Sequence, residues 1–141
     1  MSHSPIQFRN LRLTFPQKTC FEDFTASIYS GNRIAIVGRN GSGKTALFKI
    51  LQNILEPTAG AVTVPSDVSF GYVPQVIEET NNASGGQKFM STLSKALLKH
   101  PNVLILDEPT NHLDSSNRKS LFNMLSRYKG TLITASHDSQ F

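Results

Sequence analysis

Hydrophobic positions along this chain recur with two different periods, and the alternation between the periods predicts a series of strands and helices. Apolar residues at every second position indicate a strand over residues 6–15, with one register change, and another over residues 24–28 that we expect to pair with it. Residues 33–37 predict a buried strand, and the unbroken apolar run at 103–106 predicts a strand buried on both faces. A last strand is expected at residues 131–135.

Apolar residues at helical spacing predict three helices between these strands. The first ends before Pro57, the second covers residues 86–99, and the third covers residues 114–128, where an aspartate supplies the N-cap. Two short strands, at residues 61–64 and 68–73, flank a turn. The positions expected to face inward from the three helices are Leu47, Phe48, Ile50, Leu51, Ile54, Met90, Leu93, Ala96, Leu97, Leu121, Phe122 and Leu125.

This order of elements predicts an α/β fold with a mainly parallel sheet flanked by helices and an N-terminal antiparallel β part. Ligands of such sheets bind at the carboxyl ends of the parallel strands. The length of 141 residues suits one domain with a single core.

A phosphate-binding loop is predicted at residues 38–45, because GRNGSGKT fits the pattern GxxxxGK[ST] at every fixed position. The glycines let successive backbone N–H groups point at phosphate oxygens, and the following helix adds its positive end. Lys44 is expected at the β- and γ-phosphates, and the Thr45 hydroxyl at Mg²⁺. A glycine-rich turn with an incidental lysine is the alternative, and the flanking strand and helix disfavour it. The predicted nucleotide contacts are Gly38, Asn40, Gly41, Ser42, Gly43, Lys44, Thr45 and Ala46.

Two carboxylates follow the apolar run at 103–106. Asp107 is predicted to hold Mg²⁺ opposite Thr45, and Glu108 to accept a proton from an attacking water. Taken alone, the pair could be two solvated acids at a strand end, but the phosphate loop upstream favours catalysis. A second anion-binding arrangement, SGGQ at 84–87, opens the second helix, although by itself it could be a flexible turn.

Composition adds few constraints. Hydrophobic residues make up 38% and charged residues 17%, as in soluble globular domains, and the longest apolar run is far too short to cross a membrane. Residues 1–5 lack the features of a signal peptide, and the single cysteine, Cys20, cannot form an internal disulfide, so a cytoplasmic location is expected. The net charge of +4 is spread along the sequence without a basic run, so it does not by itself indicate nucleic acid.

Together these motifs resemble the ABC (ATP-binding cassette) ATPase superfamily. The resemblance rests on GRNGSGKT at 38–45, YVPQ at 72–75, SGGQ at 84–87, LILDEP at 104–109 and SHD at 136–138. EPTNHLD at 108–114 and SHDSQF at 136–141 are most similar to the ABC-F branch, whose members mostly work on ribosomes.

The resemblance implies roles for several further residues. Phe15 matches an aromatic residue that stacks on adenine, although a core phenylalanine is an equal alternative. Gln75 matches a loop glutamine that contacts Mg²⁺ and the attacking water. His137 matches the switch histidine that bonds the γ-phosphate. Asp114 matches a loop at a dimer interface, although it could equally serve only as a helix cap.

The resemblance further implies a head-to-tail dimer that hydrolyses ATP with Mg²⁺ at composite sites. In such a dimer Ser84 and Gly86 of one copy would contact the γ-phosphate bound to the other. The expected partners are therefore ATP, a second copy or homologous domain, and either ribosome and RNA or a membrane transporter subunit. No transmembrane segment is expected in this chain itself.

The chain departs from the family pattern in two places. Only residues 76–83 separate Gln75 from Ser84, where family members carry a helical subdomain, and the sequence ends at Phe141, just after His137. Residues 1–141 are thus expected to form a single, shortened ABC-type ATP-binding domain. The alternatives are a nucleotide-binding module without significant turnover, because the missing segment prevents closure, and an ATPase subunit of a membrane transporter.

Overall fold

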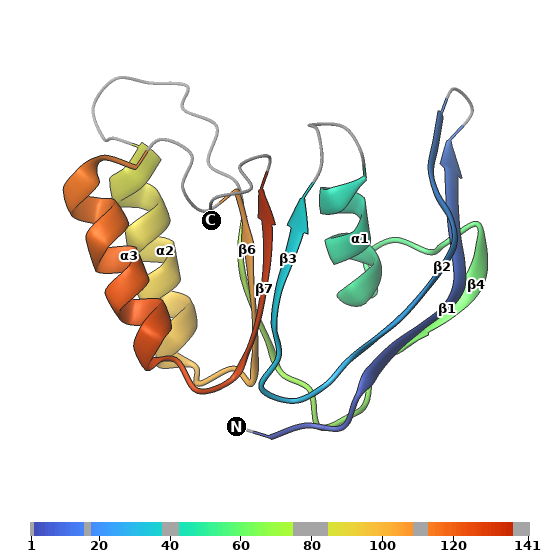
Figure 1. Cartoon of the computed structure of the whole chain (residues 1–141), viewed down its shortest axis with the longest axis horizontal. Coiled ribbons are helices and arrows are strands. Elements are labelled where there is room, and N and C mark those ends of the chain that lie inside the picture. Colours follow the sequence, from blue (N-terminus) through green and yellow to red (C-terminus); the bar gives the residue numbers. More distant parts are fainter. Residues whose placement is uncertain (1, 16–17, 38–42, 75–84, 109–112, 137–141) are drawn as a thin grey trace.

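The computed structural model describes residues 2–15, 18–37, 43–74, 85–108 and 113–136. Two sheets and three helices make up this part of the chain (Figure 1). The elements in chain order are β1 (Ile6–Phe15), β2 (Lys18–Ile28), β3 (Arg33–Val37), α1 (Lys44–Leu51), β4 (Ala59–Thr63), β5 (Phe70–Val73), α2 (Gly85–Leu98), β6 (Val103–Asp107), α3 (Ser115–Arg127) and β7 (Thr131–Ser136).

The larger sheet is parallel throughout, with the strand order β3-β7-β6-β5. Its central strand β6 is the apolar run that the sequence marks as buried on both faces, and every residue from Val103 to Leu106 is 0% exposed. The α/β class and the parallel sheet agree with the prediction. Because the strands are parallel, their carboxyl ends meet at one edge, where Asp107 ends β6.

The smaller sheet is antiparallel, with the order β2-β1-β4. The predicted pairing of the first two strands is confirmed, and the register shifts between Phe8 and Leu11, where the sequence pattern also changes. The two short strands on either side of the turn at 65–67 belong to different sheets, because β4 pairs with β1 whereas β5 pairs with β6.

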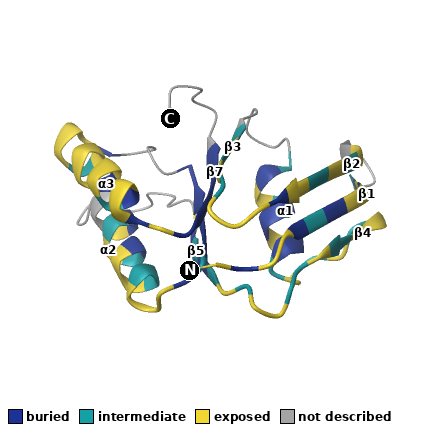
Figure 2. Cartoon of the chain, turned by 60° about the horizontal axis from the view of Figure 1, so that its bottom comes forward, coloured by how far each residue is buried: buried dark blue, intermediate teal, exposed yellow. Residues whose placement is uncertain are grey.

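The helices cover the parallel sheet on both faces. Helix α1 lies between the two sheets, and α2 and α3 lie side by side against the opposite face (Figures 1 and 2). Strand β6 shows the division clearly: Val103 and Ile105 belong to the core cluster with α1 and β1, and Leu104 and Leu106 to the cluster with α2 and α3. Odd-numbered residues of β6 therefore face α1, and this places Asp107 toward the beginning of that helix.

Two residues expected to face inward are exposed instead. The first helix ends at Leu51, and Ile54, which lies beyond it, is 68% exposed. The Ile54 N–H donates to the Lys49 carbonyl and Asn53 adopts a positive φ of 62°, so the chain turns away before Ile54 can reach the core. On α3, Leu121 and Leu125 are buried, whereas Phe122 is 47% exposed because it lies about 100° around the helix from Leu121.

The far end of the parallel sheet is held by contacts of α3 and its C-cap. The Arg33 guanidinium donates to the Leu125 carbonyl at 2.8 Å and to the Tyr128 carbonyl, so it caps the C-terminus of α3. The Tyr128 hydroxyl donates to the Pro101 carbonyl at 2.8 Å. Among the helices of the described ranges, none is long and apolar enough to span a membrane.

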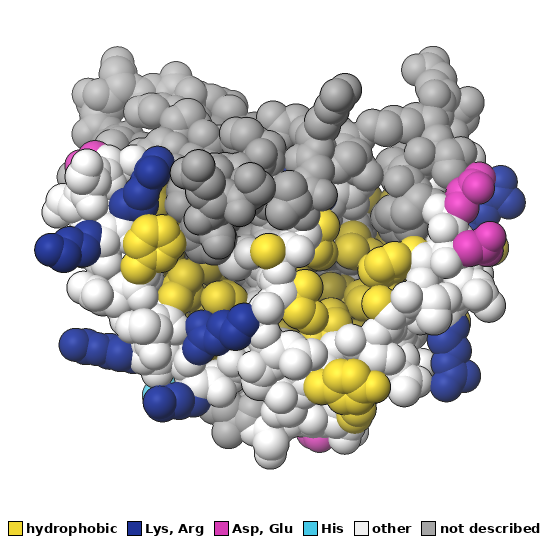
Figure 3. Space-filling view, viewed as in Figure 1, with side chains coloured by type: hydrophobic (Ala, Val, Ile, Leu, Met, Phe, Trp, Pro, Cys, Tyr) yellow, Lys and Arg dark blue, Asp and Glu magenta, His cyan; other side chains and the backbone are white. Residues whose placement is uncertain are grey.

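On the other side of the sheet, apolar side chains line a small cavity of about 90 Å³ between β3 and the antiparallel sheet. Figure 3 shows hydrophobic side chains at the surface on this face of the molecule. The apolar side chains that line the cavity include Phe24, Ile34 and Ile36, which are only partly buried.

Candidate nucleotide-binding site

The first two residues of α1 supply two of the predicted site residues. Lys44 and Thr45 follow Gly43, whose φ of 100° and ψ of 7° lie in the left-handed region. A glycine adopts this conformation without strain, and the Gly43 carbonyl accepts the first helical hydrogen bond, from the Leu47 N–H, at 2.9 Å. The sharp turn thus directs the beginning of α1 at the carboxyl edge of the parallel sheet, where an anion meets unpaired N–H groups and the helix dipole.

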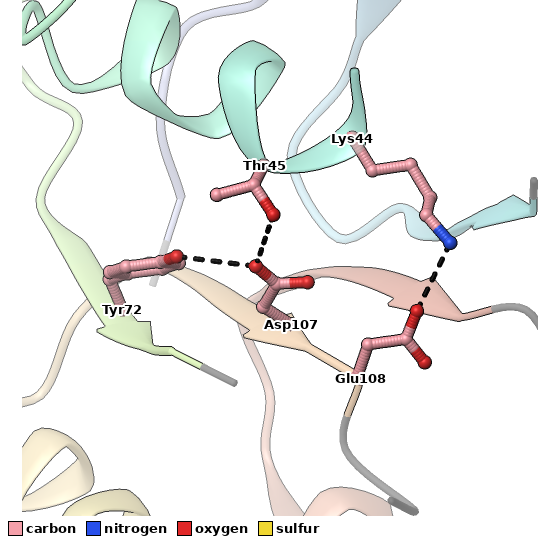
Figure 4. Close-up of polar contacts among 5 residues, drawn as sticks. All are labelled: Lys44, Thr45, Tyr72, Asp107 and Glu108. Atoms are coloured by element: carbon pink, nitrogen blue, oxygen red, sulfur yellow. Dashed lines mark hydrogen bonds and ion pairs between the residues drawn. The ribbon is translucent and has the colours of Figure 1, made fainter. Parts of the chain in front are cut away.

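Thr45 and Asp107 meet at this edge, as predicted. The Thr45 hydroxyl donates to Asp107 Oδ2 at 2.9 Å (Figure 4). Thr45 is exposed, whereas Asp107 is only 2% exposed. Burial raises the pKa of Asp107 above 3.8, although the hydrogen bonds from Thr45 and Tyr72 oppose the shift. Burial therefore makes the charged form of Asp107 less favourable than that of a solvent-exposed aspartate.

Lys44 and Glu108 form a buried ion pair beside it. Lys44 Nζ lies 3.1 Å from Glu108 Oε1, and the two side chains are 7% and 3% exposed. The backbone of Glu108 is constrained as well: its φ is 53°, and its N–H donates to the Ala135 carbonyl at 2.7 Å. A non-glycine residue in the left-handed region costs about 1 kcal/mol, and such strain gathers at functional sites. The fold therefore holds Glu108 in a strained conformation immediately after β6.

Tyr72 is a member of the site that the sequence reasoning missed. It lies on β5, next to β6, and its hydroxyl donates to Asp107 Oδ2 at 3.4 Å (Figure 4). Burial raises the pKa of the Tyr72 hydroxyl to about 12, and the negative charge of Asp107 adds to the shift. Only the register of the parallel pair, in which Tyr72 lies beside Ile105, could have identified this neighbour.

The residues present fit a magnesium ion bound together with phosphates. Within the described ranges, no group of three or more His, Cys, Asp or Glu side chains could hold a metal by itself. Mg²⁺, however, is usually bound through one or two carboxylates together with substrate phosphates and water. The Thr45 hydroxyl and the Asp107 carboxylate are oxygen ligands of this kind, 2.9 Å apart.

Other predicted residues lie outside the described ranges or show only their backbone. Phe15 is the last residue of β1 and Gly86 lies in the first turn of α2, and at both positions the side-chain surroundings are not described. Ala46 is half-buried against the core between the sheets. The predicted site residues outside the described ranges are Gly38, Asn40, Gly41, Ser42, Gln75, Ser84 and His137.

Asp114 caps α3. Its carboxylate accepts a hydrogen bond from the Asn117 N–H at 2.8 Å, so the helix-cap role is confirmed. The side chain is exposed, and its role at a dimer interface stays a prediction.

Comparison with known proteins bears on the family and the fold. The family model described as ABC transporter matches residues 21–76 and 66–111. A solved structure of a metal-chelate type ABC transporter in an inward-facing conformation has the same fold, with a TM-score of 0.79 over 98% of this chain and 74% of that chain, at 20% sequence identity.

Several curated proteins are similar in sequence. The ribosome protection protein VmlR of Bacillus subtilis is 30% identical over 96% of this chain. The zinc import ATP-binding protein ZnuC of Haemophilus influenzae is 31% identical over 94%, and an ATP-binding protein Uup-like of the same organism is 33% identical over 88%. The chain spans 29%, 66% and 37% of the lengths of these three relatives. Because the family match extends over residues 21–111, well over half of the chain, this protein belongs to the ABC transporter family as a nucleotide-binding domain with an ABC-F-like sequence.

Proposed function

We propose that this domain binds ATP with Mg²⁺ and hydrolyses it to ADP and phosphate. The observation that carries the proposal is the meeting of an ion pair and a hydroxyl–carboxylate pair at one edge of the sheet. Lys44 and Thr45 at the beginning of α1 contact Glu108 and Asp107, respectively, at the end of β6. An ammonium, a hydroxyl and two carboxylates in this arrangement are the groups that phosphoryl transfer to water requires.

In the free protein Lys44 is paired with Glu108, and we propose that nucleotide replaces this partner. The β- and γ-phosphates carry more negative charge than one carboxylate, and they arrive at the N-terminus of α1, where the helix dipole favours anions. Lys44 would turn from Glu108 to the phosphates. The Glu108 carboxylate, held by its strained backbone, would then be available to accept a proton from water.

Thr45 and Asp107 would hold the magnesium ion, directly or through water. The bound cation supplies charge stabilisation for the phosphoryl group. Gln75 and His137 retain their predicted roles of contacting Mg²⁺ and water and of bonding the γ-phosphate. Phe15 is proposed to stack on adenine.

Phosphate release from radiolabelled ATP tests the proposal. The wild-type domain should release phosphate in the presence of Mg²⁺, and Glu108→Gln should reduce the rate by about 10²- to 10⁴-fold. Glu56→Gln removes the same charge from an exposed residue between α1 and β4 and should retain the wild-type rate. An equal rate in Glu108→Gln would exclude Glu108 as the base.

We further propose that two copies assemble head to tail, so that Ser84 and Gly86 of one contact the γ-phosphate held by the other. Gly86 lies at the beginning of α2, a helix N-terminus suited to an anion. Light scattering of Glu108→Gln with and without MgATP would test the assembly. An ATP-dependent shift from monomer to dimer supports it, and an unchanged mass with ATP bound refutes it.

A binding module without turnover is the second candidate, and the shortened region favours it. The alignments to relatives extend over 159 to 176 positions, more than the 141 residues of this chain, so the relatives contain residues with no counterpart here. If the segment missing between Gln75 and Ser84 is needed for closure, ATP would bind without being hydrolysed. A single-turnover assay with excess protein separates the two, because only the ATPase releases phosphate.

The cellular task is proposed more coarsely. VmlR is described as a ribosome protection protein and ZnuC as an ATP-binding protein of zinc import, so the relatives work in two settings. We propose a cytoplasmic location, with either ribosomal RNA or a membrane transporter subunit as the partner.

A further inference from the structure

The positive charge of the chain is gathered on one layer of the fold, although it is scattered along the sequence. Helices α2 and α3, with Lys99 and Lys129 in the segments that follow them, hold seven of the 14 Lys and Arg residues and no Asp or Glu residue, whereas β6 ends in Asp107 and the exposed Asp114 caps α3. All seven are exposed: Lys88, Lys95, Lys99, Arg118, Lys119, Arg127 and Lys129. We call this surface of α2 and α3, with Lys99 and Lys129 beside them, the basic face.

Helices α2 and α3 lie side by side on the same side of the parallel sheet, so the seven side chains belong to one layer of the fold, although Arg118 and Arg127, nine residues apart, lie on opposite flanks of α3. Figure 3 shows Lys and Arg side chains over this part of the molecule, where hardly any acidic side chain is seen. No ion pair within the described residues neutralises any of the seven charges. In the rest of the described chain, six Lys and Arg residues are offset by seven Asp and Glu residues, so the excess of positive charge lies on α2 and α3 and the residues that follow them.

The other exposed side chains of the basic face favour nucleic acid over a lipid surface. Most of them are serine or asparagine, such as Ser91, Ser94, Asn123 and Ser126. Short hydroxyl and amide side chains interleaved with Lys and Arg are typical of contacts to a sugar-phosphate backbone. A helix that enters a membrane surface needs a broad apolar stripe, whereas the large apolar side chains exposed on α2 and α3 are Phe122 and Leu98.

Resting on the ribosomal RNA named above as a proposed partner, we propose that the basic face is the surface that binds RNA, through its phosphates. Helices α2 and α3 lie on the face of the sheet opposite α1, and their C-terminal ends, with Lys95 and Arg127, lie away from the beginning of α1, whereas their N-terminal ends adjoin Gly86 and Asp114 of the proposed dimer contact.

Fluorescence anisotropy with a labelled single-stranded RNA of mixed sequence tests the proposal. The face variant carries Lys95→Glu, Arg118→Glu and Arg127→Glu. A matched control carries Lys49→Glu, Arg9→Glu and Arg12→Glu, which change the same charge at exposed positions of α1 and β1.

The wild type and the control should bind RNA in 50 mM salt, and the face variant should bind at least about tenfold more weakly. Each lost phosphate contact reduces the magnitude of the slope of log affinity against log salt concentration by about 0.7. The three substitutions of the face variant should therefore reduce the magnitude of this slope by about 2. No binding by the wild type, or equal losses in both triple variants, would overturn the proposal. Binding to vesicles of anionic lipid that depends on the basic face, without RNA binding, would overturn it in favour of a membrane. Retained ATP binding by the face variant separates this result from a failure of the ATPase proposal.

A separate observation assigns a role to Tyr72, and it rests on the proposed magnesium site. Thr45 and Phe48 are three residues apart on one face of α1. Thr45 donates to Asp107, and the Phe48 ring packs edge-on to the Tyr72 ring with centroids 6.3 Å apart. The Tyr72 hydroxyl also donates to Asp107, so the Thr45 and Tyr72 hydroxyls share the acceptor Oδ2.

The geometry points to Tyr72 as a positioning residue for the metal-binding carboxylate. With both hydrogen bonds from described side chains at Oδ2, the Asp107 carboxylate is fixed in one rotation about its Cβ–Cγ bond, which orients Oδ1 for a cation. Partners of this kind typically contribute 10- to 100-fold to metal affinity. Because the Tyr72 hydroxyl lies 3.4 Å from Asp107 Oδ2, we expect its contribution to metal affinity to be at the lower end of that range.

Calorimetric titration of ATP in saturating Mg²⁺ and in EDTA measures the gain in affinity that magnesium provides. Tyr72→Phe, which keeps the contact with Phe48, should reduce this gain by about tenfold and leave the affinity in EDTA unchanged. Tyr128→Phe is the control, since it removes a tyrosine hydroxyl at the far end of the sheet.

An unchanged gain in Tyr72→Phe, or equal losses with and without magnesium, would overturn the positioning role. The absence of ATP binding in the wild type would instead refute the proposed function, and the inference with it.

Discussion

Replacing Glu108 by glutamine should tighten ATP binding while it slows hydrolysis by about 10²- to 10⁴-fold. In the free protein the Lys44 ammonium is already paired with Glu108 at 3.1 Å, and both side chains are almost completely shielded from water. ATP must therefore compete with an internal carboxylate for the lysine. Glutamine retains the shape and one oxygen but loses the charge, so the competition weakens and the repulsion between position 108 and the γ-phosphate disappears.

The magnitude follows from the geometry. Two unit charges 3.1 Å apart attract each other by about 5 kcal/mol at an effective dielectric constant of about 20. The cost of removing both groups from water offsets most of this attraction. If about 1 to 2 kcal/mol remains, Glu108→Gln should bind ATP about 5- to 30-fold more tightly than the wild type.

Isothermal titration at saturating Mg²⁺ measures this difference, with Glu56→Gln as the matched loss of one exposed carboxylate. The control should retain wild-type affinity. An affinity of Glu108→Gln equal to or weaker than that of the wild type would refute the competition, and Lys44 would then not be restrained by Glu108 in the free state.

Other variants test the electrostatics and the packing around the site. Burial raises the pKa of Asp107, so the folded state holds that proton more tightly, and the contribution of Asp107 to stability falls as pH rises from about 4 through the raised pKa. Asp107→Asn should therefore melt a few degrees higher than the wild type at pH 7 without ligand, yet lose the magnesium-dependent gain in ATP affinity; equal melting temperatures at pH 7 would contradict the burial argument. Gly60→Ala should cost at least about 2 kcal/mol in urea unfolding, because φ is 81° there and an added Cβ would lie 2.1 Å from the Asn10 carbonyl oxygen; an unchanged midpoint would contradict this. Gly130→Ala should cost about 1 to 3 kcal/mol by the same measurement, because the Cβ would lie 2.3 Å from the Tyr128 hydroxyl, and a loss below 0.5 kcal/mol would show that the tyrosine moves aside.

The sequence predicts the fold well where periodicity is strong. The buried run at 103–106 and the helical spacing around Leu121 and Leu125 become β6 and α3 as expected. The prediction of buried side chains is wrong where their exposure depends on the residue at which a helix ends or on the rotation of the helix about its axis. Ile54 follows the end of α1, and Phe122 lies one step around α3 from a buried leucine.

The pairing of Thr45 with Asp107 could be predicted from motifs, because a phosphate loop and a strand-end carboxylate meet at one sheet edge in an α/β fold. Tyr72 could not be placed there, because its contact with Asp107 depends on β5 lying next to β6. The basic face was missed for a related reason. Its residues are far apart in sequence, and only the packing of α2 beside α3 brings them together.

ATP binding by the wild type and by Lys44→Ala tests the central claim most directly. Lys49→Ala provides the control, because it removes an exposed lysine from the same helix. We expect the wild type and the control to bind MgATP in titration calorimetry and Lys44→Ala to bind at least about 100-fold more weakly, as the loss of a charge-assisted contact to phosphate implies. Equal affinity in Lys44→Ala, with its fold confirmed by circular dichroism, would contradict the claim that the beginning of α1 and the end of β6 form the nucleotide site.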